Sequence, residues 1–285
     1  MVLIQVIVGG LLLGAIYALF SSGLTLIWGM MNFINFAHGE FVMLGMYVAL
    51  LVVVWLGGGP AAFGLAAAIA LFALGVVVYA LLIRHVVRGL MLAQILSSFG
   101  LALLLRYTAF WIFSANFVSL PPTSLDGTVS LGGIYLPVAQ LVAGLVAVTL
   151  TLALHLLLTR STLGSRLLAV AEDRAAATLM GIRPDRMQAL TWGLSAGAAG
   201  IAGALLAAAY PWSPSVGETF GLLAFVTVAL GGFGSVLGSL YAGLIIGLIQ
   251  AVSAYWLGAI YKDIVVYGLF VALLWLRPQG LMGKA

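Results

Sequence analysis

Residues 61–83 read AAFGLAAAIALFALGVVVYALLI, an apolar stretch without a single charged side chain. A helix needs about 20 residues to cross a hydrocarbon core of about 30 Å, so this stretch is long enough to span a membrane. Residues 136–158 are similarly apolar. A transmembrane β-barrel would instead show short segments of alternating polarity, which neither stretch has. The two stretches therefore predict a helical membrane protein.

The composition of the whole chain agrees with this interpretation. Hydrophobic residues make up 64% of the 285 residues, charged residues only 6%, and the mean hydropathy is +1.25. A soluble domain carries about 25% charged residues. We therefore expect a single all-α transmembrane domain over residues 1–285, with about 8–10 spans at roughly 20 residues each. The chain has no cysteine, which excludes a disulfide framework and cysteine-based metal or redox sites.

Hydropathy divides the chain into nine expected segments. They are residues 3–28, 38–56, 60–83, 91–113, 136–158, 187–210, 218–232, 234–257 and 263–277. The first segment lacks the basic region and cleavage site of a secretory signal, so we interpret it as a retained span. All seven tryptophans fall near segment ends, where we expect them at the membrane interface: Trp28, Trp55, Trp111, Trp192, Trp212, Trp256 and Trp275.

The basic residues indicate the orientation. Arg84 and Arg88 mark one loop, five arginines lie between Arg160 and Arg186, and Arg277 and Lys284 lie near the C-terminus. The positive-inside rule predicts that these regions are cytoplasmic, and nine crossings then place the N-terminus outside. Glycine pairs four residues apart predict close helix contacts, at Gly193/Gly197, Gly217/Gly221, Gly234/Gly238 and Gly243/Gly247.

Two segments interrupt the hydrophobic pattern. Residues 2–56 contain no lysine or arginine and are too long for two spans, and the surplus lies at residues 30–40, MMNFINFAHGE. Backbone outside a regular helix is tolerated at membrane depth only where protein buries it or a cavity borders it. We therefore expect a broken or re-entrant segment, with Asn35, His38 and Glu40 beside a solute pathway.

The second interruption lies in the other half of the chain. Gly231, Gly232 and Gly234 break the apolar run between residues 217 and 257. Paired glycine-broken segments in the two halves of a transporter indicate a pathway and a weak internal two-fold repeat.

Several polar residues leave alternatives open. His38 and Glu40 could simply cap a helix, since a carboxylate at a helix N-terminus is favourable by about 0.3–1 kcal/mol. A metal site is disfavoured, because residues two apart do not share a helix face and no third ligand follows. Arg106 could snorkel to an interface or meet a substrate carboxylate, and we favour snorkelling. Glu218 is expected to begin a helix.

Residues 159–186, TRSTLGSRLLAVAEDRAAATLMGIRPDR, form the longest polar segment. Asp173 can cap a short helix, Gly181 can end it in a left-handed conformation, and Pro184 prevents its continuation. The result is a stub that presents Leu179, Met180 and Ile182 to the cytoplasm. The alternative is a basic helix that lies on lipid headgroups.

This loop carries a family resemblance. Glu172-Asp173 through Ala176-Ala177 to Gly181-Ile182 is similar to the cytoplasmic coupling loop of ABC importer permeases. Residues 35–40 with Leu44-Gly45, and residues 230–235 with Gly238, resemble permeases of the high-affinity branched-chain amino acid importers. Residues 277–281, RPQGL, resemble their C-terminal ending. The resemblance covers essentially the whole chain, but Asp173 and Arg174 stand where small residues would be expected.

The resemblance implies a similar second permease subunit, two cytoplasmic ATPases, an extracytoplasmic solute-binding protein and a bacterial inner membrane. The chain has no Gly-x-x-x-x-Gly-Lys-Ser/Thr motif, so we expect no cofactor in it, with ATP and magnesium bound by the partner ATPases. We predict a non-enzymatic permease for branched-chain or other hydrophobic amino acids. Urea, amide or sugar permeases of related type are close alternatives. An ion-coupled secondary transporter is less favoured, because carboxylates are scarce inside the spans.

Overall fold

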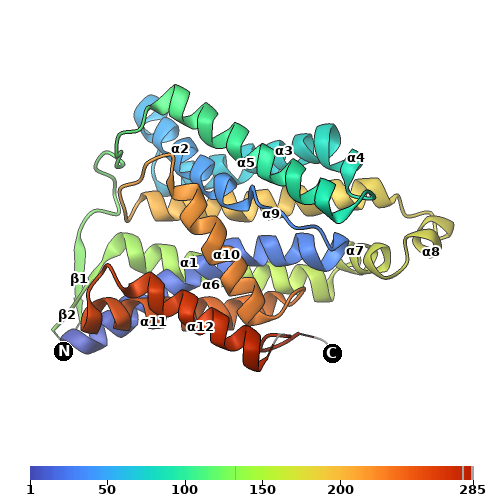
Figure 1. Cartoon of the computed structure of the whole chain (residues 1–285). Coiled ribbons are helices and arrows are strands. Elements are labelled where there is room, and N and C mark those ends of the chain that lie inside the picture. Colours follow the sequence, from blue (N-terminus) through green and yellow to red (C-terminus); the bar gives the residue numbers. More distant parts are fainter. Residues whose placement is uncertain (132, 278, 284–285) are drawn as a thin grey trace.

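The computed structural model describes residues 1–131, 133–277 and 279–283, and this part of the chain is almost wholly helical (Figure 1). The first half holds α1 (Val2–Met31), α2 (His38–Leu56), α3 (Pro60–Val78), the π-helical turn η1 (Tyr79–Ile83), α4 (Arg84–Val86), α5 (Met91–Phe113), β1 (Thr128–Leu131) and β2 (Ile134–Pro137). The second half holds α6 (Val138–Arg160), α7 (Thr162–Glu172), α8 (Arg174–Leu179), α9 (Pro184–Ala207), α10 (Val216–Gly231), α11 (Val236–Leu257) and α12 (Lys262–Leu276).

Among the described residues, 7 helices are long and apolar enough to cross a membrane. They are α1, α2, α3 continued through η1 and α4, α5, α6, α9 and α11. The expectation of a helical membrane protein is confirmed. The number falls below the expected eight because α10 has 16 residues and α12 has 15, which corresponds to lengths of only about 24 and 22 Å.

Helix α1 lies at the centre of the bundle and packs against α11, α9 and α6. Its contact with α11 depends on glycine. A Cβ atom added to Gly14 would lie 2.5 Å from the carbonyl oxygen of Gly243, and one added to Gly10 would lie 2.8 Å from that of Gly247. Small residues let two membrane helices approach closely, since packing replaces the hydrophobic effect inside lipid. The expected contact at Gly243 and Gly247 is confirmed.

The arginine-rich segments gather at one end of the bundle. Figure 1 shows α4, α7 and α8 at this end, and the N-terminus with the β1–β2 hairpin at the opposite end. Arg88 Nη2 lies 3.5 Å from Asp185 Oδ1, which joins the two arginine-rich loops directly. The hairpin is antiparallel, with Thr128 paired to Pro137, and the sequence did not predict it.

Two of the seven tryptophans are covered by protein rather than exposed. Trp192 and Trp212 are fully buried, whereas Trp55, Trp111, Trp256 and Trp275 are exposed. Trp192 lies edge-on against Phe33, with ring centroids 5.5 Å apart, and Trp212 lies edge-on against Tyr47. Their position near expected segment ends is therefore no sign of lipid contact, because the neighbouring helices cover them.

Candidate functional site

The chain leaves helical geometry between α1 and α2, where the sequence predicts a break. Asn32 ends α1 in the left-handed region, with φ of 49°. The segment then turns through Asn35, whose side-chain oxygen accepts a hydrogen bond from the backbone N–H of Ala37 at 3.1 Å. Helix α2 begins at His38. The interruption itself is confirmed.

The three polar residues of this break are buried. Asn35 and Glu40 are 1% exposed and His38 is 0% exposed. His38 Nε2 donates a hydrogen bond to the Phe20 carbonyl oxygen of α1, at 2.7 Å. In the described part of the chain, Asn35 Nδ2, His38 Nδ1 and Glu40 Oε2 are buried without a hydrogen-bond partner. Among the described residues no side chain caps α2 by a hydrogen bond, so His38 is not a capping residue, whereas Glu40 lies in the first turn of α2 as that alternative expects.

Glu40 belongs to a charged cluster that joins three helices. Arg106 of α5 donates from Nε and Nη2 to Glu40 Oε1, at 3.0 and 2.6 Å, and from Nη1 to Glu218 Oε2 at 2.9 Å. The snorkelling prediction for Arg106 is wrong, because two carboxylates hold its guanidinium. No local pattern indicates this pairing, since the partners lie 66 and 112 residues away in the chain.

The N-terminal turns of α2 and α10 meet at this cluster. Glu40 lies in the first turn of α2 and Glu218 in the first turn of α10, so the expectation that Glu218 begins a helix is confirmed. Gly39 is in backbone contact with Gly217 and Gly221, and any side chain at Gly39 would collide with α10. Both carboxylates therefore lie near partial positive charge from unpaired helix N–H groups.

The second predicted break is also present. Helix α10 ends at Gly231, and Gly232 and Gly234 have φ of 96° and 84°, which favours glycine. Ser235 Oγ accepts the N–H of Gly238 at 3.0 Å and caps α11.

The C-terminal tail closes this break. The N–H groups of Leu281 and Met282 donate to the carbonyl oxygens of Leu230 and Gly231, at 2.8 and 3.0 Å. Gly280, with φ of 74°, lies against the backbone of Ala229 and Gly232. The C-terminal segment that carries the family resemblance, residues 277–281, therefore contacts the glycine break through Gly280 and Leu281. Pro278 of this segment is outside the described residues.

The predicted stub in the loop 159–186 has the expected shape. Asp173 Oδ1 accepts the N–H groups of Ala175 and Ala176, at 2.8 and 3.0 Å, and caps α8. Gly181 follows with φ of 78°, and Pro184 opens α9. The capping predictions are confirmed. The proposed docking set is Glu172, Asp173, Ala176, Ala177, Leu179, Gly181 and Ile182, of which Ala177 is buried and Ile182 half-buried.

The exposed tip of the stub is apolar. Leu179 is 88% exposed and Met180 is 82% exposed. Arg174 fixes the stub to α9 by donating to Asp185 Oδ1 at 2.5 Å and to Gln188 Oε1 at 3.1 Å. This explains the departure from small residues at position 174.

Sequence reasoning missed α7, which carries the chain from α6 to the stub. Leu167 of α7 is fully buried and packs with Leu26 and Met30 of α1. A signal was present: Ser161 accepts the N–H of Gly164 as an N-cap, and Leu163, Leu167 and Val170 follow at helical spacing.

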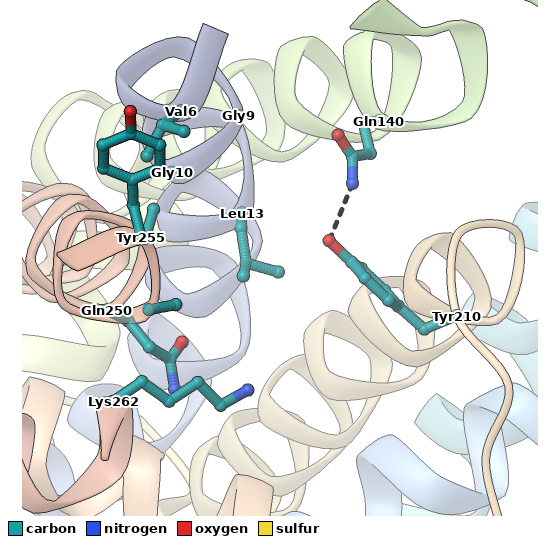
Figure 2. A pocket seen from close by; sticks show the side chains of 11 residues that line it. Val6, Gly9, Gly10, Leu13, Gln140, Tyr210, Gln250, Tyr255 and Lys262 are labelled. Carbon is teal, nitrogen blue, oxygen red and sulfur yellow. Dashed lines mark hydrogen bonds between the residues drawn. The ribbon is translucent and has the colours of Figure 1, made fainter. Parts of the chain in front are cut away.

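A cavity of about 430 Å³ opens near the N-terminal end of α1 (Figure 2). Gln140 and Tyr210 face each other across it, with a hydrogen bond of 2.7 Å from Gln140 Nε2 to Tyr210 Oη. Gln250 lies deeper, where its Oε1 accepts from Tyr17 at 2.6 Å. Lys262 also lines the cavity. The mixed lining suits water or a small polar solute.

Comparisons with known proteins place the chain among membrane permeases. The family described as branched-chain amino acid transport system / permease component matches residues 6–274. The high-affinity branched-chain amino acid transport system permease protein BraD of Pseudomonas aeruginosa is 33% identical over 99% of this chain and 96% of its own length. LivH of Escherichia coli, with the same description, is 32% identical over the same shares.

A second E. coli permease of that description, LivM, is 30% identical over 94% of this chain and 68% of its own length. No solved structure matches the chain significantly.

Proposed function

The chain belongs to the family of branched-chain amino acid transport permeases, and from this premise we propose that it forms half of a translocation pathway for branched-chain or other hydrophobic amino acids. The observation that carries the proposal is the full-length similarity to BraD and LivH, which spans every helix described above. The chain contains no phosphate-binding loop, so ATP and magnesium would be bound by partner subunits.

The proposed assembly contains a second permease, two cytoplasmic ATPases and an extracytoplasmic solute-binding protein, in a bacterial inner membrane. Similarity to both LivH and LivM of one organism supports a pair of related permeases. Residues 1–285 would act as one transmembrane domain. Helices α10 and α12 would join the seven long helices to give nine crossings, with the N-terminus outside. The paired breaks support the weak internal repeat.

We place the break at Asn35, His38 and Glu40 beside the pathway. Its support is the set of buried polar atoms without partners, because polar groups inside a membrane are costly and usually serve function. Gly231, Gly232 and Gly234 would act as the matching break near the cytoplasmic end. We propose neither a metal nor a cofactor for this chain.

The stub from Glu172 to Ile182 would dock into a groove of the ATPase. Its support is an exposed apolar tip on a short helix, whose N-terminal end is held by the Asp173 cap and by the bond from Arg174 to Asp185 of α9. The C-terminal end of this helix is closed by the bond from the Ile182 N–H to the Ala177 carbonyl oxygen. A rigid element of this kind can convert rotation of an ATPase into movement of α6 and α9.

The function is tested by reconstituting the four kinds of subunit in liposomes and measuring leucine uptake. Uptake is expected only with ATP, an active ATPase and loaded binding protein. Urea and a sugar, each with its own assay, test the related substrates. Uptake driven by an ion gradient without ATPase subunits would overturn the proposal in favour of a secondary transporter.

The docking surface is tested with Leu179→Asp and Gly181→Val. The first places a charge in the apolar contact, and the second forces a β-branched residue into a left-handed conformation. Both are expected to lose ATPase co-purification and transport-coupled ATP hydrolysis. Leu168→Asp, on the exposed side of α7, is the matched control. If Leu168→Asp alone lowers ATPase co-purification or coupled ATP hydrolysis, the loop is a membrane-surface element rather than a docking surface.

A further inference from the structure

The charged cluster of Arg106, Glu40 and Glu218 is partly exposed at the surface of the helical bundle. The Glu218 side chain is 65% exposed and that of Arg106 is 19% exposed. Arg106 lies seven residues, or about 10 Å, from the C-terminal end of the membrane-crossing α5. A charged side chain that faces hydrocarbon is costly, so the exposed Glu218 carboxylate indicates that this end of α5 and α10 borders water or protein.

The two carboxylates hold Arg106 unequally. Glu40 is buried and engages Nε and Nη2, so it fixes the orientation of the guanidinium. Glu218 is exposed and engages only Nη1. A guanidinium has five N–H donors, and donors of Nη1 and Nη2 can hold a second carboxylate in a bidentate pair. Glu218 can accept an ammonium group at the same time.

An apolar surface continues from this charge pair along α10. Leu222 lies one turn after Glu218, about 6 Å along the helix, and Phe225 follows on the same face. Leu222 is 50% exposed. Phe36 of the α1–α2 break extends the surface, with its ring centroid 5.2 Å from that of Phe225.

We propose that Arg106 and Glu218 form a binding site for the α-carboxylate and α-ammonium of the transported amino acid, whose aliphatic side chain lies on Leu222 and Phe225. This proposal rests on the proposed function, and in it Arg106, Glu218, Leu222 and Phe225 determine the substrate specificity. The Arg106 guanidinium is complementary to an α-carboxylate, and the Glu218 carboxylate is complementary to an α-ammonium. A zwitterionic amino acid can therefore bind between them without changing the net charge of the site. Glu40 is a positioning residue, because it holds Arg106 and is itself covered.

This site would select amino acids by two features. A solute without a carboxylate and an ammonium at one carbon cannot replace the Arg106–Glu218 pair. A charged side chain would lie against Leu222 and the two phenylalanines, where desolvation is costly. The site therefore favours aliphatic amino acids over urea, sugars and acidic amino acids.

The test uses the absence of cysteine in the chain, which makes a single introduced thiol unique on this subunit. Leu222→Cys is placed in the assembled importer in liposomes and treated with a membrane-impermeant, cationic methanethiosulfonate reagent. Thr108→Cys is the control, because Thr108 is exposed two residues after Arg106 and so on a different face of α5. We expect Leu222→Cys to react at least tenfold faster, and leucine-loaded binding protein with ATP to slow its reaction.

Glu218→Gln, with Glu218→Asp as the conservative variant, tests the ammonium contact. A charge-assisted hydrogen bond contributes about 1.5–3 kcal/mol, so Glu218→Gln should lower leucine uptake about tenfold or more, and Glu218→Asp should restore part of it. Unchanged importer yield and melting temperature must accompany the loss. Equal thiol reactivity at the two positions, labelling that leucine does not slow, or normal uptake by Glu218→Gln would each overturn the site. Absence of leucine uptake by the unmodified importer would instead overturn the proposed function.

Discussion

The chain interrupts its helices between α1 and α2 and again between α10 and α11, and the two breaks use different chemistry. The first buries Asn35 and His38, and Asn35 Nδ2 and His38 Nδ1 have no hydrogen-bond partner among the described residues. The second contains glycines and the capping residue Ser235, and the C-terminal tail takes up the carbonyl groups at the end of α10.

This difference indicates different tasks. Leaving a buried polar group without a partner costs about 1–3 kcal/mol, so we expect water or a solute to bond Asn35 Nδ2 and His38 Nδ1 at the first break. The second break is satisfied by backbone contacts, so it terminates two helices and fixes the tail at the end of the bundle. Four substitutions distinguish these tasks, with expected effects that decrease from Arg106→Ala to Ser235→Ala.

Arg106→Ala should destabilise the importer most, because it leaves the Glu40 carboxylate buried and unpaired. Breaking a buried ion pair in this way costs about 3–5 kcal/mol. The measurement is the melting temperature of the purified complex in detergent. The double variant Glu40→Gln/Arg106→Gln should recover much of the loss, since it buries no charge. A double variant as unstable as the sum of the two single changes would contradict the pairing.

Gly280→Ala tests the satisfied break. The new Cβ would meet the carbonyl oxygen of Ala229 at 2.5 Å and would also force a left-handed conformation on alanine. Overpacking and the unfavourable φ together should cost roughly 2–4 kcal/mol. Gly258→Ala is the matched control, because Gly258 also has a positive φ but its added Cβ meets no atom of the described residues. Equal losses in melting temperature would show that the tail does not pack tightly on α10.

His38→Ala should cost about 1–3 kcal/mol, because it removes the donor to Phe20 and leaves a gap in the core. We also expect leucine uptake to fall by more than the loss of assembled importer explains. His38→Gln, which retains a side-chain N–H donor, should preserve more of the uptake. Normal uptake per assembled complex in His38→Ala would assign this residue to packing alone.

Ser235→Ala should have the smallest effect, about 1 kcal/mol, because it removes only the N-cap of α11. Uptake per assembled complex should stay unchanged if the second break is purely structural. Ser165→Ala provides the control, since Ser165 is exposed and caps no helix. A specific loss of uptake in Ser235→Ala would remove the functional difference between the two breaks.

Local features of the site were predictable because they depend on neighbouring residues. The Asp173 cap, the left-handed Gly181 and the break at Gly231 each involve chain segments a few residues long. The family resemblance at residues 35–40 and 172–182 also correctly indicated the permease family. Helix α7 could have been predicted from its apolar spacing, but its polar flanks hid it.

The sequence by itself determined which segments are apolar helices and where many of them end, because hydropathy, capping and glycine act over a single helix turn or a single helix. Only the tertiary structure decided that Arg106 pairs with Glu40 and Glu218, that Trp192 is buried in the core and that Leu281 closes the end of α10. These contacts join residues far apart in the chain. Their free energy depends on the positions of several packed helices, and no local pattern contains that information.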